Sequence, residues 1–284
     1  MADAFFEIDG ERFVPTELTR GPWDPDAQHA GPPAALLGRA IERRALDEGD
    51  AGSRRGGQVG RITFEILRSV PLAPLTVTTE VLRPGRRVEW LGATLSDAEG
   101  EVMRATAWVF RSDPVEIPPG LASEDPASPA RVSPGPSGDG LPPGPEAGEQ
   151  SDFFPTGQSV GYHTAMEYRF VTGGFLEPGP ATVWMRMRHP LLAGEEPSPL
   201  QRVLVAADSG NGVSAALDWR HYLFINVDLT VQLHRMPAGE WVCLDAITIP
   251  EPSGVGLSDT ALYDERGPIG RATQTLLVAE RRPD

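Results

Sequence analysis

Two stretches of the chain are nearly the same, and they differ at a position that could do chemistry. GPIGRATQTLL, residues 267–277, repeats much of GEVMRATAWVF, residues 100–110. Both contain Arg-Ala-Thr at the same offset, but the next residue is Gln274 in the later stretch and Ala107 in the earlier one. A buried amide without a partner costs about 1–3 kcal/mol. Gln274 is therefore either an exposed strand residue or one member of a polar site.

Asp208 is a second candidate, because it follows the apolar run VLVAA where a helix is expected to end. The helix dipole disfavours a carboxylate at that end. Two interpretations stay open for Asp208. It is an ordinary solvent-facing turn residue, or it is a functional general base.

Other reactive side chains fit structural roles better. Cys243 alternates like a core strand residue and Ser209 fits the turn after a helix, so neither is expected to be a nucleophile. The chain contains no lysine, which excludes a Schiff-base or P-loop lysine. The histidines lack the spacing of metal ligands, so no metal site is expected. They are His29, His163, His189, His221 and His234.

These candidates lie in a repeated pattern of one helix followed by four strands. The first helix begins at Gly31-Pro32-Pro33, and the second has Ser198 as its N-cap and ends at SGNG. Period-two alternation predicts antiparallel strands after each helix. Their ranges are 61–68, 75–83, 88–97 and 102–111, then 226–235, 240–249, 255–264 and 269–278. Arg68 matches Arg235 in this alignment, and the chain is an internal duplication.

Composition limits the organisation and the partners. Residues 112–150 contain ten of the 29 prolines, which predicts a linker between units at 1–111 and 151–284. The formal net charge of −15 argues against nucleic acid or an anionic membrane as partner. No apolar run is long enough to span a membrane, and the N-terminus lacks signal-peptide features. We expect a cytoplasmic protein.

The chain resembles acyl-CoA thioesterases of the thioesterase II type. The resemblance rests on WDPDAQHAGPPAALL, EVLRPGRR, EEPSPLQRVLVAADSGNG and RATQ. It implies an α+β double-hotdog fold, in which two helix-and-sheet units form one continuous sheet. It also implies a hydrolase acting on fatty acyl-CoA, with no cofactor, in a homo-oligomer such as a dimer of double hotdogs.

Catalytic roles follow from the same resemblance. The family's Asp falls on Asp208 and its Gln on Gln274, while Asn226 occupies a position where the family has a hydroxyl. Together these would activate one water for attack on the thioester. The helix terminus at His29 and Gly31 would bind substrate.

Coenzyme A phosphates require cations. Arg83, Arg86 and Arg87 cluster at an expected hairpin tip, either as a phosphate-binding site or as a solvated turn.

Two alternatives remain open. Asp24 and His29 have the spacing of a hydratase-type hotdog that adds water to an enoyl-CoA, although Asp26 and Ala27 replace the residues usual between them. The second alternative is a non-catalytic protein that binds acyl thioesters without hydrolysing them.

Overall fold

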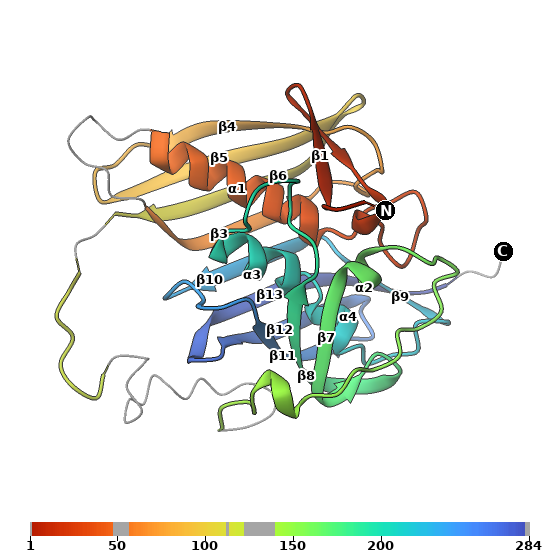
Figure 1. The fold of residues 1–284 in the computed structure, drawn as a ribbon. Helices are drawn as coiled ribbons and strands as arrows, with labels where there is room; N and C mark the ends of the chain where they lie inside the picture. Colours follow the sequence, from red (N-terminus) through yellow and green to blue (C-terminus); the bar gives the residue numbers. More distant parts are fainter. Residues whose placement is uncertain (1, 48–56, 112–113, 122–139, 282–284) are drawn as a thin grey trace.

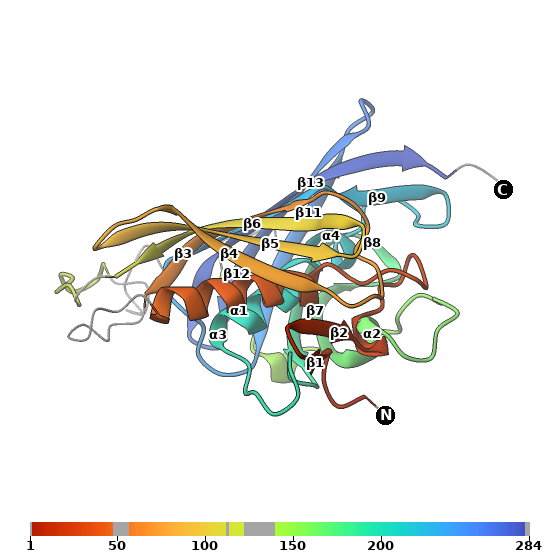
Figure 2. The same ribbon diagram turned by 90° about the horizontal axis from the view of Figure 1, so that it is seen from above.

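One antiparallel sheet runs through the molecule, and the two main helices lie against the same face of it (Figure 1, Figure 2). The computed structural model describes residues 2–47, 57–111, 114–121 and 140–281. The helices are α1 Gly31–Asp47, α2 Tyr162–Ala165, α3 Pro199–Ala207 and α4 Gly210–Val213, with single 3-10 turns at Glu17–Thr19 and Pro145–Ala147. In this part of the chain, every helix is too short or too polar to cross a membrane.

The strands form a large sheet and a small hairpin. In the first half they are β1 Phe6–Asp9, β2 Arg12–Pro15, β3 Gln58–Ile66, β4 Thr76–Arg83, β5 Val88–Asp97 and β6 Gly100–Phe110. In the second half they are β7 Met166–Gly174, β8 Glu177–Met187, β9 Tyr222–Asn226, β10 Asp228–Leu233, β11 Val242–Pro250, β12 Val255–Asp264 and β13 Gly267–Glu280. The large sheet has the order β4-β5-β6-β3-β10-β13-β12-β11-β8-β7, and β9 also pairs with β13. The hairpin of β1 and β2 is separate.

The two halves meet where β3 pairs with β10. Thr63 and Thr230 lie directly opposite each other at this junction, and their hydroxyl oxygens are 3.1 Å apart. Thr230 follows Thr63 by 167 positions, the same separation as Arg235 and Arg68. Equivalent residues therefore face each other across an antiparallel pair, and an approximate two-fold axis passes between them.

The helices occupy equivalent places but differ in length. Helix α1 has 17 residues and α3 has nine. Ser198 caps α3 by accepting a hydrogen bond from the backbone N–H of Gln201, and Pro199 occupies the first turn. The two helices pack closely at Gly38 of α1, where a Cβ atom would lie only 2.3 Å from Leu204 Cδ1 of α3.

The predicted helices and the eight predicted strands are present, with shifts of a few residues at their ends. Strands β1, β2, β7, β8 and β9 were not predicted. The run 226–235 was predicted as one strand, but it belongs to two. Strand β9 ends at Asn226, Val227 lies outside both strands, and β10 begins at Asp228. Much of the predicted 112–150 linker lies outside the described residues.

Each half is also held by an equivalent ion pair. Arg235 binds Asp264 with both guanidinium nitrogens and donates to the carbonyl of Gly267. Arg68 makes the matching contacts with Asp97 and Gly100. Burial alone would raise the pKa of Asp264, but hydrogen bonds from Arg235 and two backbone N–H groups lower it below its ordinary value.

We predict that Asp264→Asn lowers the free energy of unfolding at pH 7 by about 3 kcal/mol, because it leaves a buried guanidinium without its carboxylate. Asp97→Asn should cost less, because Arg68 is more exposed than Arg235. The Asp264 carboxylate has a lowered pKa when folded, so its contribution should disappear as the pH falls below about 4. Denaturant titrations of the three proteins measure this, and a larger loss in Asp97→Asn would contradict it.

Candidate active site

Three side chains from separate elements of the second half meet at one carboxylate. Asp208 lies directly after α3, Asn226 ends β9 and Gln274 lies within β13. Asn226 Nδ2 donates to Asp208 Oδ1 at 2.8 Å. Gln274 Nε2 lies 3.3 Å from the same oxygen and 3.1 Å from the backbone oxygen of Asp208. Asp208 and Gln274 are both buried, so Asp208 is not a solvent-facing turn residue.

The turn after α3 holds the carboxylate in place. The backbone N–H of Asn211 donates to Gln274 Oε1 at 3.1 Å, so the Gln274 amide bonds the turn through both of its ends. Gly210 lies directly on the sheet, where a Cβ atom would come within 2.6 Å of Thr260 Oγ1. The sequence SGNG thus ends the helix and also allows the turn to reach β13.

His29 approaches the other oxygen of the carboxylate. Its Nδ1 lies 3.1 Å from Asp208 Oδ2 and accepts a hydrogen bond from the backbone N–H of Gly31 at 3.2 Å. The imidazole stacks on the ring of Tyr162, with centroids 3.7 Å apart. Tyr162 is itself fixed, since its hydroxyl donates to the carbonyl of Val205 at 2.6 Å.

Burial lowers the pKa of His29, and the charge of Asp208 opposes this only in part. The ring is therefore neutral near pH 7. Because Nδ1 accepts the backbone N–H of Gly31, the proton of the neutral ring lies on Nε2. Asn226 and Gln274 both donate to Oδ1 of Asp208, and Oδ2 remains able to accept hydrogen bonds.

A pocket of about 560 Å³ opens onto this cluster. Asp208, Asn211, Asn226 and His29 contribute to its lining. The walls are mostly apolar and come from Trp23, Ile66, Leu67, Val70, Leu223, Phe224, Ile225 and Val227. Two cations, Arg68 and Arg281, also line it. No group of metal-binding side chains is present among the residues that the structure describes.

Comparison with known proteins identifies the family. Residues 19–110 match the model of the acyl-CoA thioesterase N-terminal domain, and residues 139–278 match the model of the C-terminal domain. This chain belongs to the acyl-CoA thioesterase family. It is a thioester hydrolase with a double-hotdog fold, as predicted. No curated protein sequence matches it.

Solved structures share the fold of this thioesterase at low sequence identity. A putative thioesterase II from Thermobifida fusca YX is 18% identical with a TM-score of 0.64, covering 97% of this chain and 94% of that one. The tesB protein of Mycobacterium avium subs paratuberculosis is 15% identical with a TM-score of 0.63, covering 96% and 95%. A hot dog protein of unknown function from Alicyclobacillus acidocaldarius is 15% identical with a TM-score of 0.65, covering 99% and 98%.

The structure of the thioesterase brings most of the predicted site residues together. Asp208, Gln274 and Asn226 are in direct contact, and His29 joins them. Gly31 is buried behind His29, where a Cβ atom would lie 2.4 Å from the carbonyl oxygen of Val205.

The predicted phosphate-binding cluster is elsewhere. Arg83, Arg86 and Arg87 do not line the pocket. Arg111 connects this hairpin to α1. Its backbone N–H donates to the carbonyl of Arg87, and its side chain donates to the carbonyl of Ala45. Ala45 lies in the last turn of α1, whereas His29 precedes the first. The hairpin tip is thus at the opposite end of α1 from the site.

Sequence analysis missed four residues of the site. Arg68 was noted only as the counterpart of Arg235, and Arg281 and Asn211 carried no signal of their own. Tyr162 begins the single-turn helix α2, and only the fold shows that its ring packs on His29.

Among the described residues, the first half of the thioesterase has no equivalent of this polar cluster. The positions that correspond to Asp208, Asn226 and Gln274 are occupied by apolar side chains, all of them buried. These are Ile41, Val59 and Ala107.

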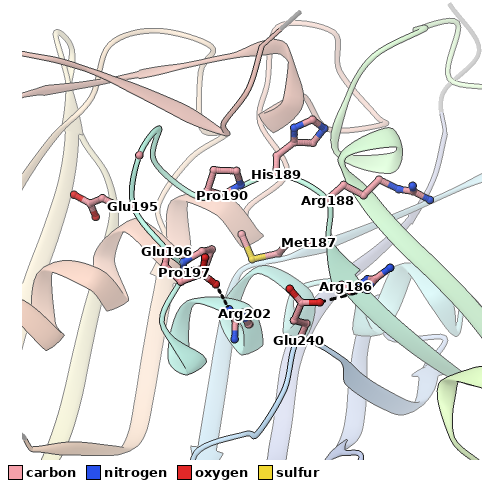
Figure 3. Close-up of a pocket in the computed structure, with 11 residues that line it drawn as sticks. Arg186, Met187, Arg188, His189, Pro190, Glu195, Glu196, Pro197, Arg202 and Glu240 are labelled. Carbon is pink, nitrogen blue, oxygen red and sulfur yellow. Dashed lines mark hydrogen bonds and ion pairs between the residues drawn. The ribbon is translucent and has the colours of Figure 1, made fainter.

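A second pocket, of about 490 Å³, lies where the repeat would place a twin site. Figure 3 shows this pocket, which the segment 186–197 lines in the same way that 21–30 lines the first. Glu196 replaces His29 there and pairs with Arg202, while Glu240 pairs with Arg186 at 3.3 Å. These four charged side chains are therefore paired with one another, and we assign the pocket no role in catalysis.

We predict that the His29 ring of the thioesterase titrates below its ordinary pKa of 6.5. Asp208→Asn should lower that pKa further, because it removes the negative charge that favours the protonated ring. An NMR titration of ¹³C-labelled histidine, assigned with a His29→Gln variant, measures both values. A pKa above 6.5 in the wild type, or a rise in Asp208→Asn, would contradict this arrangement.

Proposed function

We propose that this thioesterase hydrolyses fatty acyl-CoA by means of a water molecule that Asp208 deprotonates. The observation that carries the proposal is a buried carboxylate, held by two amide donors and flanked by His29, beside a pocket with mainly apolar walls. Asp208 Oδ2 can accept a hydrogen bond, and a water that donates there would be positioned for attack. General-base assistance of this kind accelerates a reaction by about 10²–10⁴.

The reaction then has two steps. The water oxygen attacks the thioester carbonyl carbon while Asp208 Oδ2 takes its proton, and a tetrahedral oxyanion forms. The oxyanion collapses, the C–S bond breaks, and the proton on Asp208 passes to the departing sulfur. The products are a fatty acid and free coenzyme A, and the carboxylate is regenerated.

The neighbouring residues keep the carboxylate ready for this cycle. Asn226 and Gln274 bind Oδ1, so Oδ2 is the oxygen that receives the proton. The His29 ring lies against Oδ2, and the backbone N–H of Gly31 donates to its Nδ1 and holds the ring in place. Each acts through Asp208 in this proposal, which differs from the expectation that the two amides bind the water themselves.

The lining of the pocket supports a fatty acyl-CoA substrate. Its apolar walls provide the kind of surface that buries an alkyl chain. Arg68 and Arg281 lie at the same pocket, and we propose that they bind coenzyme A phosphates in place of the hairpin arginines.

The geometry favours hydrolysis over enoyl-CoA hydration. His29 contacts Asp208, whereas Asp24 Oδ1 accepts a hydrogen bond from the backbone N–H of Asp26 and closes a local turn. Asp24 and His29 therefore do not form the pair that the hydratase alternative requires. A protein that only binds acyl thioesters would give no free thiol, which a turnover assay detects.

We predict that Asp208→Asn lowers kcat for acyl-CoA hydrolysis by about 10²–10⁴, with KM changed little, because the general base is lost while the pocket is kept. Release of free thiol from acyl-CoAs of graded chain length measures both parameters. Asp24→Asn is the matched control, since it alters a carboxylate of the same pocket and should retain turnover. Full activity in Asp208→Asn, or a wild type that binds acyl-CoA without releasing thiol, would refute the proposal.

A further inference from the structure

A row of three buried polar residues crosses the second half of the sheet beneath the site. Thr248, Ser258 and Gln274 lie directly opposite one another on β11, β12 and β13. The same row in the first half is Val81, Leu91 and Ala107, on β4, β5 and β6. All three positions are thus apolar in one copy and polar in the other. The polar cross-strand neighbours Ser258 and Gln274 thus stand where the first half has the apolar pair Leu91 and Ala107.

The hydrogen bonds of this row can be counted. The Ser214 hydroxyl donates to the carbonyl of Gly210 at 2.8 Å. The 2.9 Å contact between Ser214 and Thr248 must therefore use the Thr248 proton, because a hydroxyl has only one. Gln274 Oε1 receives the Asn211 N–H and can accept one more bond.

Ser258 is the member of the row that these hydrogen bonds do not include. Its side chain is fully buried, at 0% exposure, and its hydroxyl has no hydrogen-bond partner among the described residues. A buried hydroxyl without a partner is strongly disfavoured, so it must have an acceptor nearby. Gln274 Oε1 is the acceptor with spare capacity that lies directly across the strands. Both oxygens border Gly210, where a Cβ atom would be 3.1 Å from Ser258 Oγ and 3.2 Å from Gln274 Oε1.

We propose that Ser258 is a positioning residue, whose hydroxyl donates to Gln274 Oε1 and sets the orientation of that amide. This inference rests on the proposed function, because Gln274 matters through Asp208. With Ser258 and the Asn211 N–H both donating to Oε1, the amide has its oxygen towards the sheet and its NH₂ towards Asp208. A flipped amide would face two donors with its NH₂ and would place its oxygen against a carboxylate.

Four proteins test this role through a double-mutant cycle: the wild type, Ser258→Ala, Gln274→Ala and the double variant. Ser258→Ala should lower kcat about 3- to 10-fold, the equivalent of one hydrogen bond, with KM unchanged. In the Gln274→Ala background the same change should have no further effect, because the amide it orients is gone. Thr182→Ala is the control, since it removes a buried hydroxyl from β8, two strands away from β12 in the sheet, and should leave kcat unchanged.

A spectroscopic measurement tests the contact without any use of activity. The ¹⁵N side-chain amide of Gln274, assigned by its loss in Gln274→Ala, should change shift and exchange faster with water in Ser258→Ala but not in Thr182→Ala. Unchanged amide signals, or an equal fall in kcat in both backgrounds, would overturn the role of Ser258. Full activity in Gln274→Ala would instead contradict the proposed function, while the amide signals would still test the contact.

Discussion

The site depends on the burial of one carboxylate. A charge removed from water must be compensated by donors, and at the C-terminal end of a helix the backbone supplies none, because its free groups there are carbonyls. Asp208 is therefore stable only if other elements bring N–H groups to it. Asn226 and Gln274 do so from β9 and β13, while His29, from the loop before α1, lies against the other oxygen. The arrangement of those elements is what the fold provides.

The duplication makes this arrangement possible. The approximate two-fold axis at Thr63 and Thr230 places the start of α1 beside the end of α3, so that His29 from the first half reaches Asp208 in the second. One copy then keeps apolar side chains at the three positions of the cluster, and the other carries the polar groups there.

Much of this could be predicted from the sequence, and the limits have physical causes. The repeat, both helices and eight strands follow from periodicity and turn residues. Asp208 stands out because a carboxylate is unfavourable at the C-terminal end of a helix. Gln274 stands out because the first half has Ala107 at the same position. His29 was singled out for a different partner, since Asp24 is close in sequence whereas Asp208 is close only in space. Strands β1, β2, β7, β8 and β9 were not predicted. The Arg83 hairpin could not be placed, because neither periodicity nor local charge says which end of α1 a hairpin will occupy.

The central claim is that Asp208 activates water and does not attack the thioester itself. A single turnover in H₂¹⁸O, with enzyme in excess over acyl-CoA, tests this directly. Attack by water predicts that the first fatty acid released carries one ¹⁸O atom and that the enzyme remains unlabelled. An unlabelled fatty acid, with ¹⁸O in the peptide that contains Asp208, would show that the carboxylate had formed an anhydride and would contradict the account.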